Sequence, residues 1–227
     1  IAAYGKIIPK EWLEIQKFGL LNVHPSLLPK YRGPSPIQAA ILNNEKETGI
    51  TVILMDEKID HGPTIINKKS NIKNQNYREL EKELAELGAE LLIEVLPKWL
   101  NGKIKPIGQN HAEATYTKKF SWPDGKIDWN KSVEEIDRQI RALNPEPGVW
   151  TSWNGKILKI LEALLAGSKN DKIKTGQVFL TENKKAAIKC GFDTALLPEI
   201  VQPEGKKSMG INNFLNGHRN FVGSKLT

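Results

Sequence analysis

Cysteine is almost absent from this chain, which has a single one, Cys190, among its 227 residues. An internal disulfide and a cysteine metal cluster are therefore both excluded, and we expect a protein of the reducing cytoplasm. Long apolar runs are missing too. Charged residues interrupt the most apolar stretch, Leu91 to Leu100, well short of the ~20 residues that a membrane helix needs. Hydrophobic residues make up 39% of the chain and charged residues 26%, as in globular proteins.

An initiator methionine is also missing, because the sequence opens with Ile1 and an apolar segment that runs to Gly5. We expect that a preceding segment is absent and that the first domain is incomplete at its amino end. The sheet of that domain would then lack neighbouring strands at one edge. For this reason we expect the 227-residue piece alone to have little or no activity.

Acidic residues are in the minority, since 33 lysines and arginines face 26 aspartates and glutamates, for a formal charge of +7. Residues 1–105 hold an excess of two basic groups and residues 106–227 an excess of five. A basic second half favours an anionic partner such as RNA. Solvated lysines on an ordinary surface would give the same balance, so charge alone does not identify the partner.

The first half of the chain has the pattern of an α/β domain, which we place at residues 1–105. Short apolar runs at 20–24 and 51–55 are typical of buried strands. A helix between them, at 35–43, predicts a right-handed βαβ crossover with parallel strands. Apolar residues recur every three or four positions from Tyr77 to Leu100, which predicts a long amphipathic helix across that sheet.

The second half has a different pattern. Residues 106–123 have the Gly, Pro, Gln and Asn content of a linker, and a second domain follows at 124–227. This domain begins with a helix, 133–143, for which Ser132 and Glu135 would form a capping box. Several short runs that are alternating or apolar predict strands, and short strands with turns between them predict a small OB-like β-barrel; these runs are 149–153, 157–164, 176–180 and 186–190.

Polar residues interrupt the first apolar run at its end. Asn22 and His24 lie two positions apart on the predicted strand, so both project from one face at its carboxyl end, where ligands gather in open α/β sheets. The segment Asn22-Val23-His24-Pro25-Ser26-Leu27-Leu28-Pro29 resembles the active-site signature of the folate-dependent formyltransferases. Asp60, in Ile59-Asp60-His61-Gly62-Pro63, matches the catalytic aspartate of that family.

The chemistry of these three residue types fits formyl transfer to an amine. Amine attack on a formyl carbon develops an anionic oxygen and a cationic nitrogen. The Asn22 amide would donate to the oxygen, and His24 would accept and return a proton near neutral pH. Asp60 would fix the His24 tautomer and favour its imidazolium form. A metal site of His24, Asp60 and His61 is the alternative, but no local His-x₃-His or carboxylate cluster supports it, so we expect no metal.

The resemblance implies a Rossmann-like formyltransferase domain, truncated at its amino end, with 10-formyltetrahydrofolate as co-substrate. It also implies that three segments contact the folate. Core packing is the other interpretation of the two isoleucines in the first of them. The segments are Lys6, Ile7 and Ile8; then Ser26, Leu27, Leu28 and Pro29; then Asp56 and Glu57.

Two further segments bear on the acceptor amine. Residues Tyr31 to Gln38 resemble the tRNA and aminosugar branches of the family and differ from the purine branch. The segment from Gln202 to Gly217 is similar to the closing segment of the tRNA branch. The resemblance therefore implies initiator Met-tRNA as partner, a monomer, and phosphate contacts from Lys206, Lys207 and Arg219. An aminosugar nucleotide or glycinamide ribonucleotide acceptor, and a non-catalytic RNA-binding remnant, stay open as alternatives.

Overall fold

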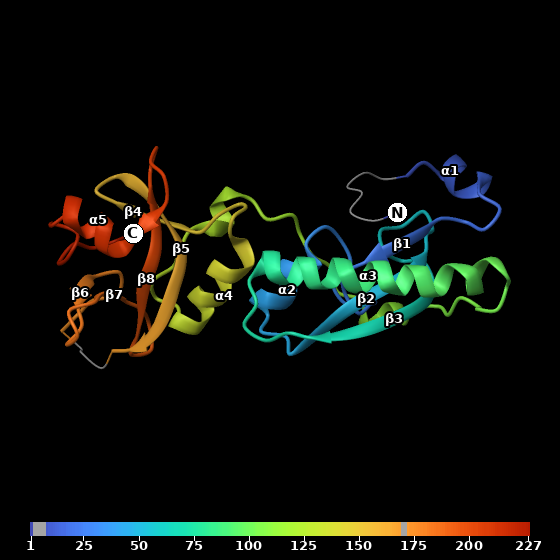
Figure 1. Cartoon of the computed structure of the whole chain (residues 1–227), viewed down its shortest axis with the longest axis horizontal. Helices are drawn as coiled ribbons and strands as arrows, with labels where there is room; N and C mark the ends of the chain where they lie inside the picture. Colours follow the sequence, from blue (N-terminus) through green and yellow to red (C-terminus); the bar gives the residue numbers. More distant parts are fainter. Residues whose placement is uncertain (2–7, 169–171) are drawn as a thin grey trace. The chain divides into compact units, whose positions relative to one another are not determined.

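The computed structural model describes residues 1, 8–168 and 172–227, and it divides them into two compact units (Figure 1). The first unit is Ile1–Lys119 and the second is Phe120–Thr227. The boundary falls inside the segment 106–123 that we expected to be a linker. Residues 107–117 belong to the first unit and form backbone hydrogen bonds with the rest of it, such as the bond from the Thr64 N–H to the Ile107 carbonyl at 2.8 Å.

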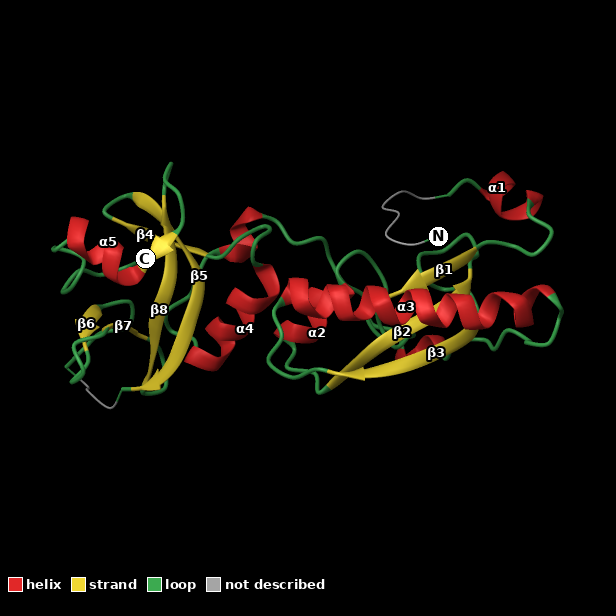
Figure 2. Cartoon of the chain, viewed as in Figure 1, coloured by secondary structure: helices red, strands yellow, loops and turns green. Residues whose placement is uncertain are grey.

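The first unit is a three-stranded sheet with one long helix running along it (Figures 1 and 2). Its elements are α1 (Lys10–Ile15), β1 (Leu21–His24), α2 (Pro36–Leu42), β2 (Glu47–Leu54), β3 (Thr64–Asn71), α3 (Tyr77–Leu100) and the 3₁₀ helix η1 (His111–Glu113). The strand order is β1-β2-β3. β2 is buried along most of its length, whereas β1 is half-buried except at His24.

The predicted parallel crossover is wrong. β1 pairs antiparallel with β2, in a register that places His24 opposite Thr51. The connection contains only the two-turn helix α2, and β2 begins at Glu47 and runs back along β1. Apolar runs report burial, and burial is the same for a central antiparallel strand as for a parallel one, so strand direction was not in the pattern.

The long helix α3 is confirmed over the predicted residues. Asn76 and Glu79 form a capping box at its start. Its buried stripe includes Leu80, Leu84 and Leu91, and Figure 1 shows the helix running along the sheet. The helix approaches the sheet closely at Gly88, where a Cβ would lie 2.9 Å from a methyl carbon of Val23. The packing of α3 therefore supports β1, the strand that carries Asn22 and His24.

We expect Leu84→Ala to lower the free energy of unfolding by about 2–5 kcal/mol, because the truncation leaves a cavity under α3. The Leu84 side chain is 1% exposed. The matched control is Ile93→Ala on the same helix, whose side chain is 74% exposed and which should change stability by less than about 0.5 kcal/mol. Chemical denaturation followed by circular dichroism measures both. Equal losses would show that α3 does not pack on the sheet through this stripe.

The second unit is a six-stranded antiparallel sheet with two α-helices. Its elements are η2 (Trp122–Gly125), α4 (Val133–Leu143), β4 (Trp150–Trp153), β5 (Lys156–Gly167), β6 (Val178–Leu180), β7 (Ala186–Lys189), β8 (Thr194–Pro203), β9 (Met209–Gly210) and α5 (Ile211–Gly217). The strand order is β4-β5-β8-β7-β6, and β9 pairs with β8. The predicted helix and its capping box of Ser132 and Glu135 are confirmed.

The tail, residues 223–227, hydrogen-bonds to both ends of this strand order. Ser152 on β4 and Thr227 exchange two backbone hydrogen bonds, at 2.7 and 3.1 Å. Val178 on β6 donates its N–H to the Ser224 carbonyl and accepts from the Gly223 N–H, each at 2.9 Å. The tail therefore bridges the two strands that end the sheet.

Candidate active site

The three residues singled out in the sequence come together at one end of the small sheet. Asn22 and His24 are on β1, and Asp60 follows β2 in the loop that leads to β3. The Asn22 amide nitrogen donates to Asp60 Oδ1 at 3.3 Å. The Nδ1 atom of His24 lies 3.5 Å from the same oxygen. One carboxylate oxygen therefore faces both the amide and the imidazole.

The Asp60 carboxylate is held by a backbone donor on its other oxygen. The Gly33 N–H donates to Asp60 Oδ2 at 2.7 Å. Gly33 has φ of +104°, a conformation that favours glycine, and a Cβ there would lie 2.9 Å from the Thr117 carbonyl oxygen. Asp60 itself has φ of +46°, in the left-handed region. The loop backbone thus turns the carboxylate toward β1 and keeps it there.

His24 is buried, with 4% of its surface exposed, and its tautomer follows from its partners. Its Nε2 lies 2.9 Å from the Tyr31 carbonyl oxygen, which only accepts, so Nε2 carries the hydrogen. In the neutral ring Nδ1 is then unprotonated and faces Asp60. We expected Asp60 to fix the tautomer; in the structure the Tyr31 carbonyl does so. Nδ1 is the nitrogen that is free to take a proton.

Two opposing effects act on the pKa of His24. Burial lowers it below the usual value, while the charge of Asp60 and the Tyr31 carbonyl raise it, and burial has the larger effect. The lowered pKa keeps the imidazole neutral at physiological pH. A neutral imidazole beside a carboxylate has the protonation state of a general base.

The turn after β1 is fixed by internal hydrogen bonds. Ser26 Oγ donates to the Lys30 carbonyl at 2.6 Å, and Thr51 Oγ1 donates to the Ser26 carbonyl at 2.7 Å and accepts from the Leu28 N–H at 3.1 Å. Ser26 and Leu28 are buried, so their side chains shape the turn, while Leu27 and Pro29 are partly exposed. Folate contact by this turn stays a prediction.

The other residues expected to contact folate are less closely grouped. Asp56 Oδ2 lies 2.6 Å from Nδ1 of His61, the residue that follows Asp60. Glu57 is exposed and pairs with Lys10 at 2.9 Å. Ile8 is half-buried. Lys6 and Ile7 lie outside the described residues.

Comparison with known proteins matches both units of the chain. The sequence model of the formyl transferase family matches residues 1–96, and that of the formyl transferase C-terminal domain matches residues 119–219. A methionyl-tRNA formyltransferase of Dictyoglomus turgidum is 45% identical over 229 aligned positions, which cover 100% of this chain and 73% of that protein. One of Carboxydothermus hydrogenoformans is 42% identical, over 98% of this chain and 72% of that protein. The chain belongs to the methionyl-tRNA formyltransferase family.

Solved structures support the formyltransferase fold. The N-formyltransferase of Helicobacter canadensis, solved with folinic acid and dTDP-3-aminofucose, has a TM-score of 0.63 and 26% identity, over 81% of this chain and 66% of that one. HypX from Aquifex aeolicus, solved with tetrahydrofolic acid, has a TM-score of 0.68 over 89% of this chain and 36% of that one. At 20% identity the second shows the fold alone.

Three residues at this candidate site were not among the site residues expected from the sequence. Arg32 served only as a marker of the family branch, and Gln109 and Tyr116 lay in the expected linker. The structure places both beside Arg32, and Gln109 also contacts the Asp60 loop. The one signal in the sequence was an arginine in the segment right after the signature. Its partners, 77 and 84 residues away, were not readable from local pattern.

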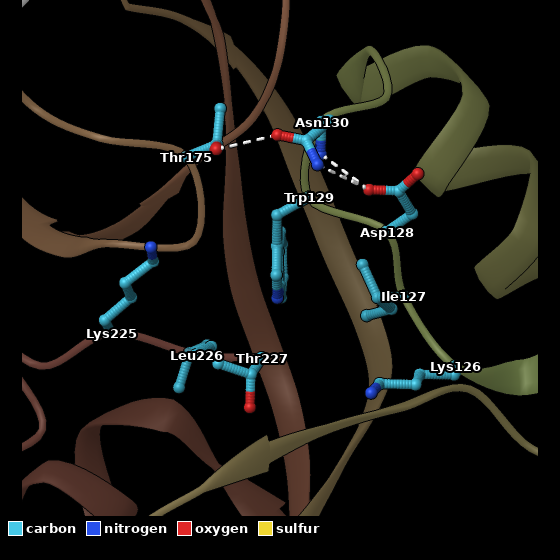
Figure 3. A pocket seen from close by; sticks show the side chains of 9 residues that line it. All are labelled: Lys126, Ile127, Asp128, Trp129, Asn130, Thr175, Lys225, Leu226 and Thr227. Carbon is cyan, nitrogen blue, oxygen red and sulfur yellow. Dashed lines mark hydrogen bonds between the residues drawn. The ribbon is translucent and has the colours of Figure 1, made fainter.

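A pocket of about 420 Å³ lies in the second unit (Figure 3). Figure 3 shows the Trp129 ring in the middle of its lining, with Lys126 and Lys225 among the other side chains. Its polar groups bind one another: Thr175 Oγ1 donates to Asn130 Oδ1 at 2.9 Å, and Asn130 Nδ2 donates to Asp128 at 3.0 Å. Asn22, His24 and Asp60 do not line this pocket.

In the part of the chain that the structure describes, no group of three or more His, Cys, Asp or Glu side chains is placed to hold a metal ion. Among the helices of those same residues, none is long and apolar enough to span a membrane.

Proposed function

We propose that this protein transfers the formyl group of 10-formyltetrahydrofolate to the amino group of initiator Met-tRNA. The observation that carries the proposal is the convergence of Asn22 and His24 on the carboxylate of Asp60, in a chain of this family. The N-formyltransferase of Helicobacter canadensis, which was solved with folinic acid, supports a folate co-substrate. The nine residues named above for folate contact are part of this proposal.

Each step of the transfer has a group in this site. As the amine attacks the formyl carbon, the carbonyl oxygen becomes anionic. The Asn22 amide has two N–H groups, of which Asp60 takes one, so the other is available to the oxyanion. His24 Nδ1 accepts the proton from the attacking nitrogen, and the adjacent Asp60 charge stabilises the imidazolium. Collapse of the intermediate breaks the bond to the folate nitrogen, to which His24 returns the proton.

The acceptor amine is tested by comparing substrates. Protein from the complete reading frame is supplied with 10-formyltetrahydrofolate and Met-tRNA, a dTDP-aminosugar or glycinamide ribonucleotide. We expect kcat/KM to favour Met-tRNA by at least ~10², because a built site discriminates by that much or more. Preference for the aminosugar would refute the proposed acceptor. Binding of Met-tRNA without any transfer would indicate a non-catalytic RNA-binding protein.

We further propose that the second unit is an OB-like barrel that holds the tRNA, and that the protein acts as a cytoplasmic monomer. The antiparallel strand order and the tail that bridges β4 and β6 support a barrel. Lys206 and Lys207 lie on the turn between β8 and β9, and Arg219 follows α5; all three are exposed. Exposed cations on such a surface are suited to phosphate contacts.

Replacing Lys206, Lys207 and Arg219 together with alanine should weaken tRNA binding and flatten its dependence on salt, because each lost phosphate contact lowers the logarithmic salt slope by roughly 0.7–0.9. Folate binding should not change. Filter binding across a range of salt concentrations measures the slope. The matched control is Lys184→Ala/Lys185→Ala, on the exposed turn between β6 and β7. An unchanged salt slope in the triple variant would show that these three side chains are solvated and do not contact the tRNA.

A further inference from the structure

Arg32 is a charged side chain held almost entirely out of water. Its exposure is 1%, and its described partners include no carboxylate. Nε and Nη2 donate to Gln109 Oε1 at 3.2 and 2.6 Å, and Nη1 donates to the Tyr116 hydroxyl at 3.2 Å. Nη2 also lies 2.8 Å from His111 Nδ1. Burial of a cation among neutral groups is unfavourable, so a fold that keeps it indicates a role beyond packing.

Gln109 connects Arg32 to the loop that carries Asp60. Its Nε2 donates to the carbonyl of Asp60 at 2.9 Å and to that of Gly62 at 2.7 Å. Its Oε1 accepts both bonds from the Arg32 guanidinium. Every polar atom of the Gln109 amide is therefore used, and its orientation is fixed at both ends.

Two consecutive residues, Arg32 and Gly33, therefore hold Asp60 at two different atoms. Gly33 N–H holds the carboxylate, and Arg32 holds the main-chain carbonyl through Gln109. The backbone of Arg32 is anchored in turn, since its N–H donates to Thr115 O at 2.9 Å and its carbonyl accepts from the Thr117 N–H at 2.7 Å. The left-handed conformation of Asp60 needs such support, because it persists only where the surroundings impose it.

We propose that Arg32 and Gln109 are positioning residues for formyl transfer, which hold the Asp60 loop so that its carboxylate faces Asn22 and His24. The inference rests on the proposed function for its kinetic consequence. Neither side chain reaches the reacting atoms. Displacement of a catalytic group by ~1 Å lowers a rate by up to ~10², which sets the scale of the effect.

The test uses Gln109→Met in protein from the complete reading frame. Methionine keeps the length of glutamine, adds no charge and removes both donors to the loop. We expect kcat to fall by ~10–100-fold, with the KM for the folate within about threefold of wild type. The His24 pKa, measured by NMR titration, should fall further. Asp60 raises that pKa, so a carboxylate that drifts away no longer does so.

The matched control is Gln139→Met. Gln139 is also half-buried, and its Nε2 donates to two carbonyls, those of Asp124 at 2.8 Å and Lys126 at 3.1 Å, in the second unit. The control should leave kcat and the His24 pKa unchanged. Arg32→Lys, which keeps the buried charge with fewer donors, should lose part of the rate and gives an independent measurement if Gln109→Met does not fold.

Normal kcat and an unshifted His24 titration in folded Gln109→Met would overturn the inference and leave the network a packing feature. A wild-type protein that formylates no amine would instead refute the proposed function. In that case the His24 titration alone decides the inference: a fall in its pKa in Gln109→Met supports positioning, and an unchanged value refutes it.

Discussion

Replacing His24 with alanine is expected to lower the single-turnover rate of formyl transfer by at least ~10², the usual contribution of a positioned acid–base group. The reason is that Nδ1 of His24 is the only unprotonated imidazole nitrogen beside Asp60 in the described site, with Nε2 committed to the Tyr31 carbonyl. Rapid-quench measurement with saturating co-substrate isolates the chemical step from binding.

Two observations serve as controls for the His24 variant. Its affinity for folinic acid, measured by calorimetry, should stay close to that of wild type. Its thermal midpoint should show that the buried site still folds. Turnover near the wild-type rate in a folded variant would remove His24 from the mechanism.

Replacing Asp60 with asparagine is expected to lower the same rate by ~10² and to shift its pH dependence. Asparagine preserves shape and still accepts from the Gly33 N–H, so the variant removes mainly the charge. The direction of the shift follows from His24. Burial lowers its pKa and Asp60 raises it, so without the charge the pKa falls further. The acidic limb of the pH–rate profile, where protonation of His24 stops the reaction, should therefore move to lower pH.

A pH–rate series on wild type and Asp60→Asn measures this shift. An acidic limb that moves to higher pH, or a rate that does not fall, would show that Asp60 does not act on His24.

The sequence predicted the proximity of the three candidate side chains better than it predicted the sheet. Asn22 and His24 share one strand face at fixed spacing, so their proximity needs only local geometry, and Asp60 joins them as expected. The predicted direction of β2 relative to β1 was wrong, because apolar content does not encode whether two strands pair parallel or antiparallel. Strand β3 was not predicted, since it lies at the sheet edge with Lys68 and Lys69 exposed, and its pattern lacks sustained alternation.

The support of the site was beyond sequence reasoning for a different reason. The His24 tautomer depends on a backbone carbonyl, that of Tyr31, and every residue has one. Gln109 lies 49 residues from Asp60 in a segment with linker composition. Long-range contacts of this kind follow from the tertiary fold, and composition alone does not report them.

The central claim is that His24 and Asp60 act as one unit in formyl transfer, and the single-turnover rate of the His24→Ala/Asp60→Asn double variant tests it most directly. When two groups act together, their effects on the activation free energy are not additive. The rate of the double variant should therefore fall by about as much as that of the slower single variant, ~10². Losses that multiply to ~10⁴ would mean that the two residues act independently, and would contradict the site described here.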